Sequence, residues 1–267
     1  MRLATFSWVV PMLALVNVAN AKPKSSASSP SVCASYVGQN ATFADFASVY
    51  ASLPEFEPMT EFETAAQFEA RKSRSAQTGA AIMLKISRAD NYDGLMYDAE
   101  KQTLRVTDAT FGRNNHDYQS LRNKVESKPQ SLASDIAFDV ATVKTLRETY
   151  TAANGFGAAV LVERTIFDTD VVYEAQTKWD SGAFLGQKGF TISQIPLDSA
   201  SAKNFVEGSS AALLIIPKFK TTGKSVSGPT FRVPIERHYN QKVIVGDIQC
   251  GFLLRSNNTV AFAFAAK

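Results

Sequence analysis

The chain has only two histidines and two cysteines among its 267 residues, and this scarcity excludes most metal and nucleophile signatures. Neither His116 nor His238 has a second histidine or a cysteine at the spacing of a metal site. Neither Cys33 nor Cys250 belongs to a Cys-x-x-Cys motif or has a histidine close by in the sequence, as a reactive thiol often does. We therefore predict no metal ion, no cofactor and no catalytic cysteine.

Signatures of nucleotide-binding enzymes and serine hydrolases are absent as well. Gly155-Phe156-Gly157 precedes a predicted strand, whereas a dinucleotide fingerprint needs a strand before its glycines and a helix after them. No Gly-x-Ser-x-Gly motif occurs. The 28 basic and 25 acidic residues nearly balance, which argues against the basic stripe of a nucleic-acid-binding protein. Beyond residue 21, no apolar run is long enough for a membrane-spanning helix.

The first 21 residues have the layout of a secretory signal peptide. Arg2 is followed by a mostly apolar stretch up to Val18, and Ala19-Asn20-Ala21 is a small-x-small cleavage site. We expect cleavage after Ala21 and a periplasmic or secreted mature chain. Residues 22–34 are predicted to be a flexible linker, because residues 22–31 contain no apolar side chain larger than alanine.

The two cysteines both survive removal of the leader. In an oxidising compartment, two cysteines allow one intrachain disulfide, which would join Cys33 to Cys250. The alternative is a buried Cys250 and an exposed, free Cys33.

The remaining chain divides into a helical segment, residues 35–79, and a β-rich region, residues 80–267. One helix is expected from a cap at Thr42 to the residue before Pro54. A second begins at the capping box that Thr64 and Gln67 form, and Gly79 is its expected terminator. The predicted fold class is α+β and mostly β. Two N-terminal helices pack on an antiparallel sheet, arranged as a sandwich or a partly open barrel, in one continuous domain.

About ten or eleven short strands are expected in the β-rich region. One hairpin pairs residues 92–98 with 103–107. Another pairs 158–164 with 171–175 around the turn-like segment Phe167–Asp170. Residues 221–229 are expected to form a loop. The other predicted strands are 81–86, 135–140, 190–193, 211–216, 231–235, 243–245, 252–254 and 260–264, with a tight turn at Asn257-Asn258.

The segment Met59–Arg71 contains Glu-Phe-Glu-Thr, then three residues, an aromatic residue, two residues and an arginine. This pattern resembles one found in uncharacterised secreted bacterial proteins, where it also precedes a β-rich region. The resemblance implies a bacterial periplasm rather than a eukaryotic secretory route, and it transfers no catalytic residue. In this chain we expect Phe62 and Phe68 to pack across the helix start, and Arg71 to pair with Gln67 or a carboxylate.

The leading functional hypothesis is a non-catalytic exported module that binds an unknown protein or a cell-envelope component. Its candidate binding surface is Trp179, which could instead cover the end of a barrel, together with His116 and Asp117. A second hypothesis is a secreted hydrolase with a dispersed carboxylate site, which requires two carboxyl groups about 5 to 10 Å apart in a cleft. A third is a structural component of an envelope assembly.

Overall fold

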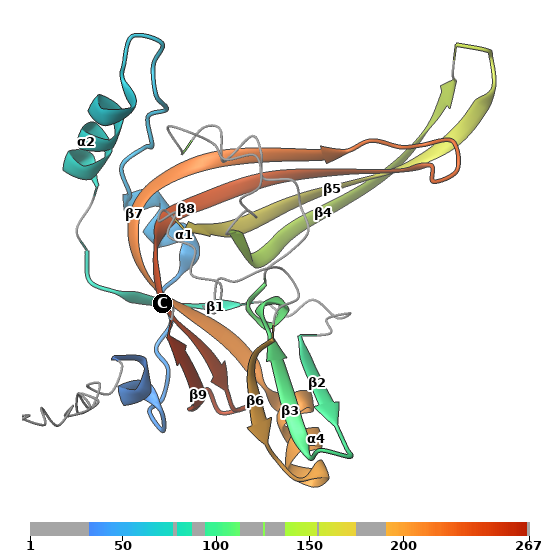
Figure 1. Cartoon of the computed structure of the whole chain (residues 1–267). Helices are drawn as coiled ribbons and strands as arrows, with labels where there is room; N and C mark the ends of the chain where they lie inside the picture. Colours follow the sequence, from blue (N-terminus) through green and yellow to red (C-terminus); the bar gives the residue numbers. More distant parts are fainter. Residues whose placement is uncertain are drawn as a thin grey trace, which may run out of the picture.

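The computed structural model describes residues 32–76, 79–86, 94–112, 125, 137–153, 155–174 and 191–265. In these residues the fold is mostly β (Figure 1). The strands are β1 (Ile82–Ile86), β2 (Leu95–Asp98), β3 (Thr103–Thr107), β4 (Ala137–Ala153), β5 (Ala159–Glu174), β6 (Thr191–Pro196), β7 (Ser210–Ser227), β8 (Ile235–Leu254) and β9 (Val260–Ala265). The helices are η1 (Val32–Tyr36), α1 (Phe46–Ser52), α2 (Ala65–Ser75), η2 (Asp108–Phe111) and α4 (Ser199–Gly208). None of these helices is both long and apolar enough to cross a membrane.

The strands form two sheets. The larger one has six strands in the order β1-β7-β8-β5-β4, and β9 also pairs with β8. The smaller one has the order β2-β3-β6 and is antiparallel. The expectation of a purely antiparallel arrangement is wrong at one point, because β5 and β8 run parallel. The chain reaches β8 from β5 only after passing through β6, α4 and β7, and a parallel pair needs a long crossover of this kind.

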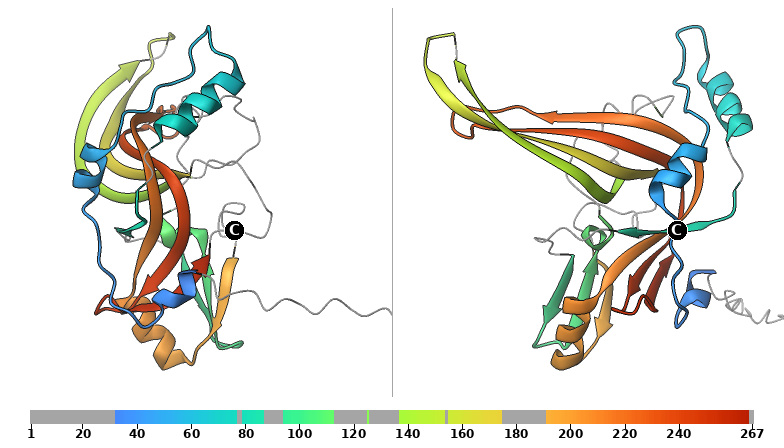
Figure 2. Two further views of the ribbon diagram at one scale, coloured as in Figure 1. Left: turned by 90° about the vertical axis from the view of Figure 1, so that its left-hand side faces the viewer. Right: turned by 180° about the vertical axis from the view of Figure 1, so that it is seen from behind.

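Four strands are much longer than is usual: β4 has 17 residues, β5 has 16, β7 has 18 and β8 has 20. Their outer halves project to one side of the molecule (Figures 1 and 2). We call this projection the arm. It consists of Val143–Ala153, Ala159–Asp168, Thr222–Ser227 and Ile235–Asn240. It also includes the two hairpin ends, residues 155–158 between β4 and β5 and residues 228–234 between β7 and β8.

The predicted hairpin around Phe167–Asp170 is wrong, because β5 runs through this segment without a turn. Side chains on β8 provide partners for the turn-like residues. The Phe167 ring stacks on that of Tyr239 with 4.8 Å between centroids, and Asn240 donates a hydrogen bond to Asp168 at 3.0 Å. The hairpin end lies instead at residues 155–158, between β4 and β5.

Two further expectations fail at the end of β7. Residues 221–227 continue the strand instead of forming a loop. Gly223 fits there because the side chain of Gln241 lies against it, and a Cβ at this position would collide with Gln241 Oε1 unless that side chain moved. Residues 231–233 form a bend, and β8 begins only at Ile235, after Pro234. The short strands expected at 243–245 and 252–254 are parts of this one long strand.

Several of the predicted local features are confirmed. Residues 95–98 and 103–107 form the predicted hairpin, and Asn258 takes up the left-handed conformation of a tight turn, with φ of 62°. Thr64 and Gln67 make the predicted capping box. α1, however, begins later than expected, because Asp45 and not Thr42 accepts the hydrogen bond from the Ser48 amide. α2 ends at Ser75, before the predicted terminator Gly79.

The buried side chains gather in three clusters. One includes Leu213, Ile244 and Phe46 of α1. A second includes Phe68 of α2, Phe219 and Val243. The third surrounds the two cysteines. The arm lies beyond these clusters, so its strands must be held together by other contacts.

Candidate functional site

Cys33 and Cys250 form a disulfide that joins η1 to β8, with their Cα atoms 5.7 Å apart. Both residues are buried, so the alternative of an exposed, free Cys33 is wrong. Buried in this way, the bond is a structural tie at the base of the long sheet rather than a reactive group.

The other predicted site residues, Trp179, His116 and Asp117, lie outside the described residues, and their role stays a prediction. The predicted leader, residues 1–21, lies outside them too, as does most of the linker. Within the described ranges, no group of three or more histidine, cysteine, aspartate or glutamate side chains could hold a metal ion.

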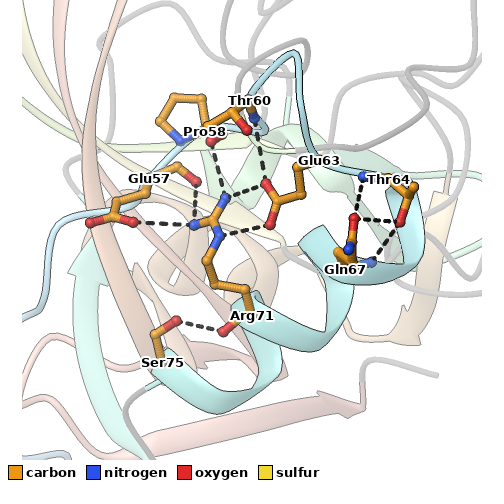
Figure 3. A network of polar contacts seen from close by, with 8 residues as sticks. All are labelled: Glu57, Pro58, Thr60, Glu63, Thr64, Gln67, Arg71 and Ser75. Carbon is orange, nitrogen blue, oxygen red and sulfur yellow. Dashed lines mark hydrogen bonds and ion pairs between the residues drawn. The ribbon is translucent and has the colours of Figure 1, made fainter.

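The first polar cluster is built around Arg71 on α2 (Figure 3). Its guanidinium binds the Glu63 carboxylate through two bonds, at 2.9 Å from Nε and 2.8 Å from the terminal nitrogen. It also donates to the carbonyl oxygens of Glu57 and Pro58 at 3.1 Å each, and to the Glu57 carboxylate at 3.4 Å. An arginine side chain has five N–H donors, and these contacts use all of them.

Arg71 and its partners therefore form a clip, by which we mean the contacts of Arg71 with Glu57, Pro58 and Glu63. Arg71 fastens the loop before α2 onto the helix, and Phe68 anchors the helix in the core. The predicted pairing of Arg71 with a carboxylate is confirmed, whereas Gln67 is taken up by the capping box. The predicted packing of Phe62 against Phe68 is wrong, because Phe62 is 89% exposed and Phe68 is fully buried.

A shallow groove of about 770 Å³ lies beside this clip and is lined by Glu57, Glu63, Phe62, Arg71 and Arg74, among others. It contains two carboxylates, those of Glu57 and Glu63. The hydrogen bond from Arg71, however, lowers the pKa of Glu63, so this carboxyl group is a poor proton donor. With both carboxylates bound to one arginine whose donors are all used, the groove does not offer an acid–base pair.

The second polar cluster lies on the arm and is centred on Glu236. One of its carboxylate oxygens accepts hydrogen bonds from Tyr150 at 2.7 Å and Arg164 at 2.8 Å. The other lies 2.6 Å from Nε2 of His238. Arg164 also pairs with Glu148 at 3.0 Å and lies over the ring of Tyr150. The cluster connects β4, β5 and β8, the strands on which these residues lie.

These contacts keep Glu236 ionised. The hydrogen bond from His238, followed by those from Tyr150 and Arg164, lowers the pKa of Glu236 from 4.5 to about 2. The same carboxylate raises the pKa of Tyr150. A permanently anionic glutamate and a phenol that resists ionisation do not make a general acid or a nucleophile at neutral pH. The cluster instead holds the arm strands in register.

Sequence reasoning missed this cluster and expected His238 in a surface loop. The available signal was short-range: Glu236 and His238 are two residues apart and therefore share one face of an extended strand. Their partners on β4 and β5 are 72 or more residues away in the chain, and no local pattern reveals them.

Exposed apolar side chains are concentrated on the arm. Apart from Val32, Val37 and Phe62, all the large hydrophobic residues exposed in the described part of the chain lie there: Val143, Leu146, Phe156, Leu161, Val226, Phe231, Val233 and Ile235. Phe156, at the end of the β4–β5 hairpin, is 99% exposed.

Comparison of the chain with protein-family models, curated proteins and solved structures finds no match to any of them. The function must therefore be inferred from these surfaces themselves.

Proposed function

We propose that this protein is an exported, non-catalytic binding module that contacts a protein partner through the two hairpin ends of its arm. The observation that carries the proposal is the accumulation of exposed apolar side chains on the arm. Scattered exposed hydrophobic residues need no explanation, but a concentration of them marks an interaction surface.

The two hairpin ends have the composition of a contact site. Phe156 lies between Gly155 and Gly157, and Gly157 takes up a positive φ of 81°, which suits a tight chain reversal. At the other end, exposed Arg232 separates exposed Phe231 from Val233. Aromatic residues and arginine are enriched among the residues that dominate binding energy at protein interfaces. The matching partner surface is an apolar pocket with carboxylates at its rim.

The polar cluster around Glu236 supports this role because it lies between the core and the hairpin ends. A binding surface gains affinity when it is held in its bound geometry before the partner arrives. The contacts of Glu236 with Tyr150, Arg164 and His238 supply that rigidity in a part of the arm that lies outside the three buried clusters.

Export is supported by two independent observations. The first 21 residues have the pattern of a signal peptide, and Cys33 is paired with Cys250. Stable disulfides of this kind are typical of proteins that fold in an oxidising compartment.

The proposal is tested by copurification of the tagged chain from its native envelope and exported fractions. Wild type is compared with the double variant Phe156→Ser/Phe231→Ser and with the matched control Phe62→Ser, which alters another exposed phenylalanine, away from the arm. We expect one protein partner to copurify in stoichiometric amount with the wild type and with the control. The amount that copurifies with the double variant should be lower by roughly tenfold or more.

Two results would contradict it. One is equal retention of the partner by all three chains, or no partner at all. The other is binding to anionic lipid vesicles that the double variant loses while no protein copurifies, which would assign the hairpin ends to a membrane surface.

A further inference from the structure

A different surface of the arm, the free edge of β4, has a pattern that matches a second copy of itself. β4 is the last strand of the six-stranded sheet. After a register shift between Thr142 and Lys144, it pairs regularly with β5 from Lys144 to Ala153. In the part of the chain that the structure describes, no strand pairs with the other side of this segment. Residues 144–149 are all exposed.

Such an edge presents unpaired backbone N–H and C=O groups over ten consecutive residues. Proteins often protect long edges with lysine, and Lys144 and Arg147 serve this purpose against a neutral or basic strand. The same charges become attractive when the incoming strand places a carboxylate opposite one of them.

We propose that two copies of this chain associate through antiparallel pairing of β4 with β4, on a two-fold axis that passes midway between the two copies of Leu146 (the axis through Leu146). Around this axis, residues whose numbers add up to 292 stand opposite each other. Leu146 then faces Leu146 of the second copy, and Lys144 faces its Glu148 twice, once on each side of the axis.

The charges select this register. Residues that stand opposite each other in an antiparallel pair have side chains on the same face of the sheet. A two-fold axis perpendicular to the sheet must therefore pass midway between one residue and its own copy, and not between two neighbouring residues. An axis through Arg147 would oppose two arginines, and one through Glu148 would oppose two glutamates. Axes through residues 145, 149 or 150 leave the charged side chains of 144–148 opposite uncharged residues. Only the axis through Leu146 opposes lysine to glutamate, and it also covers a leucine that is 48% exposed.

The pairing is isologous, so it closes after two copies and covers residues 144–148 of the β4 edge in both. Because the two strands run in opposite directions, the hairpin ends of the two arms point in opposite directions. The inference is independent of the proposed function, since it uses the edge of β4 and its residue pairs do not include Phe156 or Phe231.

The first test is cross-linking of the variant Leu146→Cys, with the native disulfide intact. Opposite residues in an antiparallel pair have Cα atoms about 4.5 to 5.5 Å apart, which is within reach of a disulfide. We expect an intermolecular disulfide to form at least tenfold faster than in the matched control Leu161→Cys, which places the thiol at another exposed leucine of the arm. Equal rates in the two variants would overturn the proposal.

The second test uses charge reversal and sedimentation equilibrium of the full chain. Lys144→Glu opposes two pairs of carboxylates and should weaken the dimer roughly tenfold, whereas Lys144→Arg keeps the positive charge, leaves the Glu148–Arg164 ion pair intact and should preserve the dimer. A wild-type chain that remains monomeric at every concentration tested would overturn the proposal. So would a dimer that is indifferent to the charge reversal, because its interface would lie elsewhere.

Discussion

Removal of the disulfide is expected to destabilise the protein mainly by freeing its unfolded state. The bond joins positions 217 residues apart, so it closes most of the chain into one loop. In the chain-entropy model, a loop of this length corresponds to about 5 kcal/mol of stabilisation, and measured disulfides often fall below the model. We therefore expect the double variant Cys33→Ala/Cys250→Ala to lose about 2 to 5 kcal/mol of unfolding free energy.

The folded structure around the bond should persist in that variant. The segment after η1 is also held by backbone hydrogen bonds from Gly38 to the Val260 carbonyl at 2.9 Å and from Ala41 to the Asn258 carbonyl at 3.0 Å. The native state thus loses only a local tie, whereas the unfolded chain gains the conformations that the loop had excluded.

The assay is urea unfolding of the oxidised wild type and the double variant, followed by circular dichroism. If the effect lies in the unfolded state, the slope of free energy against urea should rise in the variant, because its unfolded chain exposes more surface. A loss below about 1 kcal/mol with an unchanged slope would refute the loop-entropy reasoning. Hydrogen exchange at the Gly38 and Ala41 amides provides the control, since retained protection would show that the native segment is still docked.

Two smaller perturbations complete the predictions. Because the folded pKa of Glu236 is about 2 and its ordinary value is 4.5, its stabilisation is fully present above about pH 4.5 and is lost as the pH falls toward 2. The difference in urea midpoint between wild type and Glu236→Gln should therefore shrink on acidification. A difference that stays constant between pH 7 and pH 2 would argue against a lowered pKa of Glu236 in the folded protein. Thr221→Val should stabilise the protein by about 1 kcal/mol, because the fully buried Thr221 hydroxyl has no hydrogen-bond partner among the residues that the structure describes. A destabilised variant in thermal unfolding would indicate that this hydroxyl is satisfied in solution.

Features that depend on neighbouring residues could be predicted from the sequence. The capping box of Thr64 and Gln67 needs residues only three positions apart, and the 95–98/103–107 hairpin needs only a short turn. The pairing of the two cysteines followed from there being no other partner. Strand length was underestimated because Asp168 and Gly223 resemble turn residues when read locally. Each is accommodated by a side chain on β8, Asn240 in one case and Gln241 in the other.

The candidate site was less predictable than the fold. Glu236 and His238 lie on one strand, but their meaning depends on Tyr150 and Arg164, which only the parallel pairing of β5 with β8 brings within reach. The exposed phenylalanines were visible in the sequence. Their location at the end of an arm could not be predicted, because it depends on the lengths of the four long strands, and amino-acid composition does not determine those lengths.

β8 has a mechanical consequence. This one strand carries Glu236 near its outer end and Cys250 near its inner end, and it is hydrogen-bonded to β5 and β7 for most of its length. A pulling force between a bound partner and the segment attached to Cys33 would run along the strand axis. It would load the inter-strand hydrogen bonds in shear, all at once, rather than peel them apart one by one. The protein would then resist tension far better along the arm than across it.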